Sequence, residues 1–290
     1  MHKIAFIYDS VGQEQYLKIL SKMTPKRSGV WKDMVAVTNP EEADFQIVID
    51  STNYPVDPKK AIYIDAHPYI ENYIGYQDLS NKECVAKLDL KETFGFGEWW
   101  ISYDYDYLSA LPNNTKSKDL CCIMSNNHDF NNDGREKRRP FLHRFCDKFA
   151  GELNLYGRIK PTGNLMAHYK GELGVNTPDA YWYGKEQVLS DHRYSLEIDV
   201  GLTKHYFSER FFDAMLLWCM PIYWGGTTVH EWLPKESFRY FDLDKDGDDV
   251  YYIMHSDFRE QNIKAMAEAR DIILNKLQLW ARVYSLIKGL

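Results

Sequence analysis

Short apolar runs alternate with a stretch of helical spacing in the first part of the chain. Lys3–Tyr8, Phe45–Ile49 and Ala61–Ile64 are rich in β-branched and aromatic residues and are bounded by Asp, Ser or Pro. Buried strands of a mainly parallel sheet have this pattern. A helix is expected from about Glu14 to Met23. The alternation predicts a Rossmann-like domain over residues 1–111.

The polar segment 112–118 (PNNTKSK) has no periodicity and is typical of a linker. A second alternation follows it, which predicts an α/β domain over residues 119–258. Its expected strands are Leu120–Met124, Leu153–Tyr156, Tyr194–Ile198 and Pro221–Trp224, and its expected helices are Arg138–Phe149 and Glu209–Trp218. Residues 259–290 carry apolar positions at helical spacing, which predicts one or two long helices packed back across the domains. We therefore expect an α/β protein with two Rossmann-like domains and a cleft between them.

The expected helix that begins at Glu209 has the features of an anion site. Its body, FFDAMLLWCM, is apolar almost all round, which predicts a buried helix. The Ser208 hydroxyl is suited to accept amide protons of the first turn, and Pro221 is expected to end the helix. A buried helix that starts at a cleft favours a diphosphate there, through its free N–H groups and its dipole.

Charged residues at this helix start allow two interpretations. Arg210 can fork onto phosphate oxygens, and Glu209 can accept hydrogen bonds from a ribose diol. Alternatively, both residues only cap and decorate a core helix. Gly225 and Gly226, after the next strand, allow a tight turn with close backbone approach.

Residues 193–226 resemble the signature of the family 10 glycosyltransferases, the α-1,3/1,4-fucosyltransferases. The family pattern runs K-F-x-L-x-F-E-N, then Y-x-T-E-K, an apolar helix and P-I-Y-W-G. This chain has Arg193-Tyr194, Asp199, Tyr206-Phe-Ser208-Glu209-Arg210 and Pro221-Ile-Tyr-Trp-Gly225 at these places. Weaker similarity extends upstream, where Leu120–Asn126 is followed by Arg138-Arg-Pro-Phe141 and later by Leu155-Tyr-Gly-Arg158.

The resemblance implies a GT-B fold with a nucleotide-sugar site in the C-terminal domain. Glu209 would hold the ribose, Arg210 with Arg138 or Arg139 would hold the diphosphate, and Tyr206 would lie against the nucleotide. Tyr194 and Ser208 belong to the same expected donor-binding set. Asp199 stands where the family has a Glu near the donor sugar and is a candidate catalytic residue. The family Asn that follows is Val200 here, so the identity of the donor sugar stays open.

An inverting transfer needs a base that deprotonates the acceptor hydroxyl. In the resembled family this base is a carboxylate of the N-terminal domain, just after a central strand. Asp65 and His67 follow the run Ala61–Ile64, and His67 has an ordinary pKa near neutrality. Glu98, within GFGEWW, is a further candidate because the flanking aromatic rings can stack on a sugar. Capping of a strand end is the alternative role for Asp65 and His67.

Composition excludes several classes of function. The formal net charge of −7 leaves no broad basic surface for nucleic acid. No apolar run approaches the roughly 18 to 20 residues that span a bilayer, and MHKIAFIYDS does not have the pattern of a signal peptide. The five cysteines form no CxxC pair, which indicates a reducing compartment. We expect a cytoplasmic protein, in a bacterium or in the cytosol of a virus-infected host.

Three acidic motifs resemble metal sites but lack features that such sites need. Asp104-Tyr-Asp106 is a DxD sequence that precedes the linker rather than following an early nucleotide-binding strand. Two calcium-like loops begin at Asp129 and Asp242, but their twelfth positions hold Pro140 and Ile253 instead of Glu. We therefore expect no metal site and no cofactor other than the donor substrate.

The function expected from the sequence is inverting transfer of L-fucose from GDP-fucose to a glycan hydroxyl. The same scaffold acting on another GDP- or UDP-sugar is one alternative. A non-catalytic glycan-binding protein that uses an aromatic cleft is the other. The partners expected are thus a nucleotide sugar and a glycan acceptor.

Overall fold

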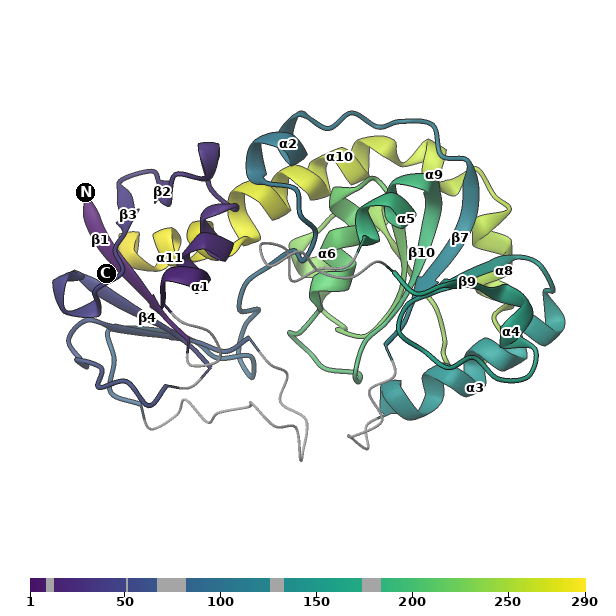
Figure 1. Ribbon diagram of the computed structural model, residues 1–290, viewed down its shortest axis with the longest axis horizontal. Helices are drawn as coiled ribbons and strands as arrows, with labels where there is room; N and C mark the ends of the chain where they lie inside the picture. The colour runs from purple at the N-terminus through teal and green to yellow at the C-terminus, as the bar shows by residue number, and fades with distance from the viewer. Residues whose placement is uncertain (9–12, 51, 67–81, 126–132, 174–183) are drawn as a thin grey trace.

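The protein contains two six-stranded sheets that lie side by side (Figure 1). The computed structural model describes residues 1–8, 13–50, 52–66, 82–125, 133–173 and 184–290. One sheet is built from residues before 89 and the other from residues after 117. We call them the N-terminal and the C-terminal sheet, and residues 89–117 the connecting segment. The predicted α/β class with two mainly parallel sheets is confirmed.

The N-terminal sheet is parallel apart from one short antiparallel pair, β2–β3. Its strands, in spatial order, are β2 (Val30–Trp31), β3 (Met34–Ala36), β1 (His2–Ile7), β4 (Phe45–Ile49), β5 (Ala61–Ile64) and β6 (Ala86–Leu88). The central strands are almost wholly buried, as their continuous apolar runs predict. Helix α1 (Gln13–Ser21) packs against β1.

The C-terminal sheet is parallel throughout. Its strands, in spatial order, are β12 (Arg239–Tyr240), β11 (Met220–Trp224), β10 (His192–Ile198), β7 (Lys118–Ile123), β8 (Leu153–Tyr156) and β9 (Tyr169–Gly171). Its helices are α3 (Asp133–Lys148), α4 (Leu165–His168), α5 (Lys185–Asp191), α6 (Glu209–Leu216), α7 (Val229–Trp232) and α8 (Asp248–Met254). Strand β10 lies in the middle, and α5 and α6 both pack against it.

The C-terminal residues contact both halves of the protein (Figure 1). They form α9 (Phe258–Gln261), α10 (Ile263–Ile272), a π-helical turn (Ile273–Leu277) and α11 (Leu279–Lys288). The predicted long helices are thus two helices joined by a π-helical turn, with the short α9 before them. Helix α10 contacts α6, whereas the α11 residue Trp280 packs edge-on against Phe6 of β1 at 4.9 Å between ring centroids. The Trp280 indole N–H donates to the Leu20 carbonyl at 3.0 Å.

Helix α6 ends for a different reason from the one predicted. Its last residue is Leu216, and Trp218 then adopts a left-handed conformation with φ +60°. The Cys219 amide turns back to the Ala214 carbonyl at 3.0 Å, as at helix ends closed by a left-handed residue. The prediction that Pro221 ends the helix was wrong, because Pro221 lies inside β11 and pairs with Ser195.

The acidic motifs of the sequence serve the fold. Asp104 caps α2 (Tyr105–Ala110), accepting the Tyr107 amide at 3.0 Å, and also pairs with Arg27 at 2.7 Å. Asp106 accepts the Lys26 amide at 2.7 Å. The loop that begins at Asp242 pairs with basic residues of α3, through Asp244–Lys137, Asp246–Arg144 and Asp246–Lys148. Most of the other calcium-like loop, residues 129–134, falls outside the described residues.

Candidate functional site

A buried carboxylate organises the end of β10 and the start of α6. Asp199 follows β10 and is fully buried. Its Oδ2 accepts the Ser208 amide at 3.2 Å and the Tyr223 hydroxyl, and its Oδ1 accepts the Ser208 hydroxyl and Arg210 Nη2, the latter at 3.0 Å. The predicted cap is therefore corrected: Ser208 makes no side-chain cap, because its hydroxyl donates to Asp199.

Replacing Asp199 by Ala is expected to lower the free energy of unfolding by about 3–5 kcal/mol. The substitution leaves the Arg210 charge and the Tyr223 hydroxyl without their partner inside the protein. Denaturant unfolding of wild type and variant measures the loss. Asp244→Ala is the matched control, because Asp244 is 68% exposed and its pair with Lys137 is worth about 0–1 kcal/mol. Equal losses for the two variants would contradict the assigned role of Asp199.

Two arginines converge on one carbonyl oxygen at this end of β10. Arg210 of α6 donates to the Ile198 carbonyl at 2.7 Å, and Arg138 of α3 donates to the same oxygen at 3.0 Å. Burial opposes the charged form of Arg210, but Asp199, Glu197 and Glu209 outweigh it and raise the pKa of the guanidinium. Both guanidinium groups are mostly enclosed at this end of the strand, and a guanidinium so placed is suited to bind a phosphate oxygen.

Helix α3 also begins against this edge of the sheet. The Gly134 amide donates to the Val200 carbonyl at 3.1 Å. A Cβ atom at Gly134 would lie 1.8 Å from the Asp199 carbonyl oxygen, so no larger residue fits without a backbone shift. The starts of α3 and α6 thus meet at the carboxyl end of β10, where ligands of open α/β sheets bind. Arg139, the next residue on α3 after Arg138, is half-buried.

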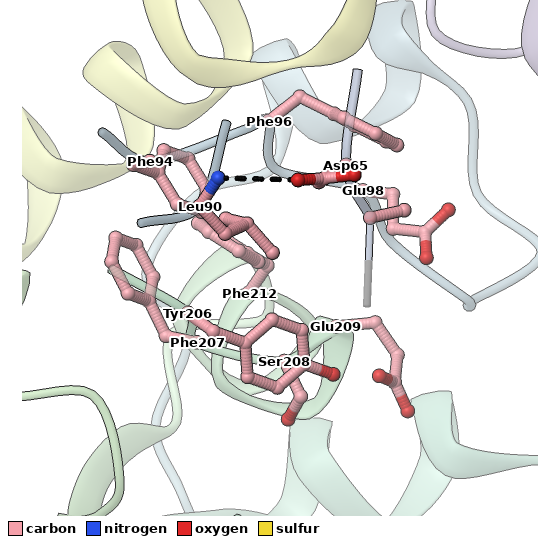
Figure 2. A pocket seen from close by; sticks show the side chains of 11 residues that line it. Asp65, Leu90, Phe94, Phe96, Glu98, Tyr206, Phe207, Ser208, Glu209 and Phe212 are labelled. Carbon is pink, nitrogen blue, oxygen red and sulfur yellow. Dashed lines mark hydrogen bonds between the residues drawn. The ribbon is translucent and has the colours of Figure 1, made fainter. Parts of the chain in front are cut away.

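The start of α6 opens onto a pocket shared by both parts of the protein. Asp65, Ala66, Leu90, Phe94, Phe96 and Glu98 line it from the N-terminal sheet and the connecting segment, and Tyr206, Phe207, Ser208, Glu209 and Phe212 line it from α6 and the preceding loop. Figure 2 shows Asp65 and Glu98 on one side and Tyr206, Ser208 and Glu209 on the other, with Phe212 between them and Phe94 and Phe207 at the flank. The Phe94 and Phe207 rings stack at 4.1 Å and hold the two sides together.

Asp65 is a buried carboxyl group of this pocket with a raised pKa. It follows β5, is 1% exposed, and accepts the Leu90 amide at 3.4 Å through Oδ2 (Figure 2). Its Oδ1 has no hydrogen-bond partner in the described part of the chain. Burial raises the pKa of Asp65 to about 7; the Leu90 amide opposes this, whereas the nearby carboxylates Asp89 and Asp50 add to it. A carboxyl group with this pKa can exchange a proton near neutral pH.

Of the other two candidates for the base, the structure describes Glu98 but not His67. Glu98 is half-buried in the connecting segment and lines the same pocket. His67 lies outside the described residues. Asp65 and Glu98, far apart in the sequence, therefore face one pocket.

Not every expected donor-binding residue reaches this pocket. Tyr206, Ser208 and Glu209 line it, whereas Arg138, Arg139 and Arg210 are not among its lining residues. Tyr194 does not line it either, which corrects the expectation from the sequence: it is fully buried near the amino end of β10, and its hydroxyl accepts the Arg259 amide at 3.1 Å. It lies four residues before Ile198, or about 13 Å along a strand.

One buried carboxyl group near the arginines was missed in the sequence. Glu197 of β10 is 3% exposed and accepts the Ser195 hydroxyl at 2.5 Å. Burial raises its pKa to about 7, against the effect of the nearby Arg210 charge. A Glu inside the otherwise apolar strand pattern of Tyr194–Ile198 was the signal that could have found it, because buried carboxylates need a partner.

Several further features concern ligands and environment. Among the residues that the structure describes, no group of three His, Cys, Asp or Glu is placed to hold a metal ion. None of the helices in the described ranges is both long and apolar enough to cross a membrane. All five cysteines are free, and four of them are buried.

Comparison with known proteins gives a weak sequence match and a clear fold. No protein-family model matches the chain. A Danio rerio protein described as GDP-fucose protein O-fucosyltransferase 3 is 22% identical over 83 residues, which cover 29% of this chain and 17% of that protein. The match thus spans about a sixth of the length of that relative.

Several solved structures match over nearly the whole chain. An α1,3-fucosyltransferase is 14% identical with a TM-score of 0.50, covering 99% of this chain and 90% of that one. A glycosyltransferase from Rickettsia africae ESF-5 is 11% identical with a TM-score of 0.51, covering 99% and 96%. At these identities the likeness shows the fold, which is GT-B, as the resemblance in the sequence implied. The chain is similar to fucosyltransferases and other glycosyltransferases in sequence signature and in architecture.

Proposed function

We propose that this protein is an inverting glycosyltransferase that transfers L-fucose from GDP-fucose to a hydroxyl group of a glycan. The single observation that carries the proposal is the shared pocket. It places a carboxyl group with a pKa of about 7, Asp65, across from the start of α6, with Arg210 directly behind that helix start. The fucosyltransferase-like signature and the GT-B fold support the same reaction class.

The diphosphate of the donor binds at the start of α6. First-turn amides lack acceptors within a helix, and the dipole there favours negative charge. Asp199 already takes the Ser208 amide, so the amides of Glu209 and Arg210 are the ones left for phosphate oxygens. Arg210 and Arg138 supply the positive charge that stabilises the leaving diphosphate, and we propose that no divalent metal is needed. The Glu209 carboxylate accepts the ribose hydroxyls.

The acceptor enters from the opposite side, where Asp65 and Glu98 lie (Figure 2). The acceptor oxygen attacks the anomeric carbon of the sugar, and the bond from that carbon to the diphosphate oxygen breaks. The acceptor proton passes to the base, and GDP leaves with the electron pair. Because base and diphosphate face each other across one pocket, attack occurs opposite the leaving group and inverts the configuration. Asp65 is the first choice of base, with Glu98 and His67 as the alternatives.

The apolar side chains of the pocket favour one class of donor sugar. Leu90, Phe94, Phe96 and Phe212 give the pocket an apolar side. An apolar wall suits the methyl group of a 6-deoxy sugar and leaves a hydroxyl at the same place without a partner. This favours fucose over a fully hydroxylated hexose. Asp199-Val200 replaces the family's Glu-Asn, so another GDP- or UDP-sugar is the second candidate, and a non-catalytic glycan-binding protein is the third.

Calorimetry with GDP, UDP, GDP-fucose and GDP-mannose tests the proposal. We expect GDP and GDP-fucose to bind. Transfer from GDP-fucose should continue at an unchanged rate in excess EDTA, because arginines rather than a metal ion stabilise the negative charge of the leaving diphosphate. Loss of the rate in EDTA, with recovery on adding a divalent metal, would refute the metal-independent mechanism. Glycan binding with no affinity for any nucleotide would favour the glycan-binding protein instead.

A further inference from the structure

Side chains from both halves of the protein hold four consecutive residues of the connecting segment. Residues 99–102 belong to no strand of either sheet. The carbonyls of Trp99 and Ile101 accept Lys22 Nζ at 2.8 and 3.1 Å. The amide of Trp100 donates to Asp213 Oδ1 at 2.7 Å, and the amide of Ser102 donates to a carboxylate oxygen of Glu186.

The two kinds of partner come from different halves of the protein. Lys22 follows α1, beside the N-terminal sheet. Asp213 lies in α6 and Glu186 in α5, both packed on the C-terminal sheet. Carbonyl groups of the segment therefore bind a cation of one half, and its amides bind anions of the other half. We call Lys22, Asp213 and Glu186 the clamp.

The clamp uses buried charge, which is costly unless every group is paired. Lys22 is 9% exposed, Glu186 8% and Asp213 0%. Asp213 Oδ2 is paired in addition with Lys185 Nζ at 2.8 Å. Apolar side chains of similar size would often give equal or greater stability at such positions. What the charged groups add here is directional hydrogen bonding. Asp213 and Glu186 each accept one particular amide, and Lys22 donates to two particular carbonyls.

The clamp joins the two sides of the pocket. Trp100 lies two residues after Glu98, which lines the acceptor side. Asp213 lies one helical turn after Glu209, which lines the donor side. A shift of the segment relative to α6 would therefore move Glu98 relative to Glu209.

We propose that Lys22, Asp213 and Glu186 are positioning residues that fix residues 99–102 between the two halves and thereby set the acceptor side of the pocket against the donor side. The inference rests on the proposed function. It differs from that function because it concerns no group that touches substrate. Misplacement of reacting groups by about 1 Å can reduce a rate about 10²-fold.

Lys22→Met tests the clamp, because Met keeps the apolar stem and removes the donor group. We expect kcat for transfer to fall about 10- to 100-fold, while the Kd for GDP from calorimetry stays within about twofold, as donor contacts lie on α6. Lys116→Met is the matched control. Lys116 is a half-buried lysine that donates to three carbonyls, those of Leu189, Ser190 and Leu217, but none of them belongs to residues 99–102. It should keep the wild-type kcat.

Amide hydrogen exchange gives a readout that does not depend on activity. The Trp100 amide should exchange slowly in wild type and in Lys185→Met/Asp213→Asn, which keeps an acceptor without an unpaired buried lysine. It should exchange at least about tenfold faster in Lys185→Met/Asp213→Ala, which lacks the acceptor. Equal exchange in the two double variants would overturn the assigned contact.

The kinetic outcomes separate the clamp from a general structural role. Wild-type kcat in Lys22→Met, or a loss of GDP affinity as large as the loss of kcat, would overturn the positioning role. A wild-type protein that binds no nucleotide would overturn the proposed function and the catalytic meaning of the clamp with it. The exchange experiment would then still decide whether the clamp holds the segment.

Discussion

Arg210→Ala is expected to weaken the binding of GDP about 10- to 100-fold. A hydrogen bond to a charged group contributes about 1.5–3 kcal/mol, and each 1.4 kcal/mol changes an affinity tenfold. Arg210 lies in the first turn of α6 and is held charged by Asp199, Glu197 and Glu209. Isothermal titration calorimetry with GDP measures the change directly.

Two controls accompany this variant. Arg27→Ala removes an arginine that is 59% exposed and belongs to the N-terminal half, so GDP affinity should not change. Arg210→Lys keeps the positive charge but loses the planar guanidinium that can make two parallel hydrogen bonds. Its affinity for GDP should therefore lie between those of wild type and Arg210→Ala. Because the Ala variant leaves Asp199 without its cation, its unfolding curve must show that it is folded. A folded Arg210→Ala that binds GDP as well as wild type would remove Arg210 from the donor site.

Asp65→Asn is expected to reduce the transfer rate by at least about 10²-fold and to leave the affinity for GDP unchanged. Asn keeps the size and an acceptor for the Leu90 amide but cannot take a proton. Single-turnover measurements with saturating donor give the rate of the chemical step. An unchanged rate would move the role of base to Glu98 or His67, and Glu98→Gln would then be the variant that loses activity.

The raised pKa of Asp65 also predicts two pH dependences. A base must be deprotonated, so the wild-type rate should rise as pH increases through about 7. Stability should change in the opposite direction. The unfolded-state pKa is about 3.9, so the folded protein binds the proton more tightly, and the contribution of Asp65 to stability falls between about pH 4 and 7. Asp65→Asn should therefore be at least as stable as wild type at pH 8, by thermal unfolding.

Asp89 offers a matched control for this assignment. It follows β6 as Asp65 follows β5, is also buried, and raises the pKa of Asp65 by its charge. Asp89→Asn should keep the transfer rate at high pH. The midpoint of the rise in rate with pH should move to lower pH, because the charge that raises the pKa of Asp65 is removed. A midpoint that stays in place would show that the rate does not report the ionisation of Asp65.

The central strands were predictable from the sequence, whereas the edges of the sheets were not. Phe45–Ile49, Ala61–Ile64 and Leu153–Tyr156 have the predicted bounds because continuous apolar runs are required of strands that are buried in a parallel sheet. The predicted pattern omits β2, β3, β6, β9 and β12, which have only two or three residues each. Such strands are defined by the neighbour that they pair with and leave little pattern of their own.

The candidate site was predictable in its parts but not in its contacts. Glu209 was singled out from the local pattern and Asp65 from the family resemblance, but no spacing in the sequence shows that they face one pocket. The cap of α6 was misread because the Ser208 hydroxyl donates to Asp199, on the neighbouring strand end, instead of accepting an amide of the first turn. Tyr194 was misplaced because a family motif gives the order of residues but not the end of the strand on which each one lies. Asp213 was read as part of an apolar helix, since its partner Trp100 is distant in the sequence.

The central claim is that the start of α6 receives the diphosphate of a nucleotide within the shared pocket. A crystal structure of the protein with GDP bound tests it most directly. We predict phosphate oxygens within hydrogen-bond distance of the Glu209 and Arg210 amides and the Arg210 guanidinium, with the ribose at the Glu209 carboxylate. A diphosphate bound elsewhere, with the start of α6 contacting only solvent, would contradict it.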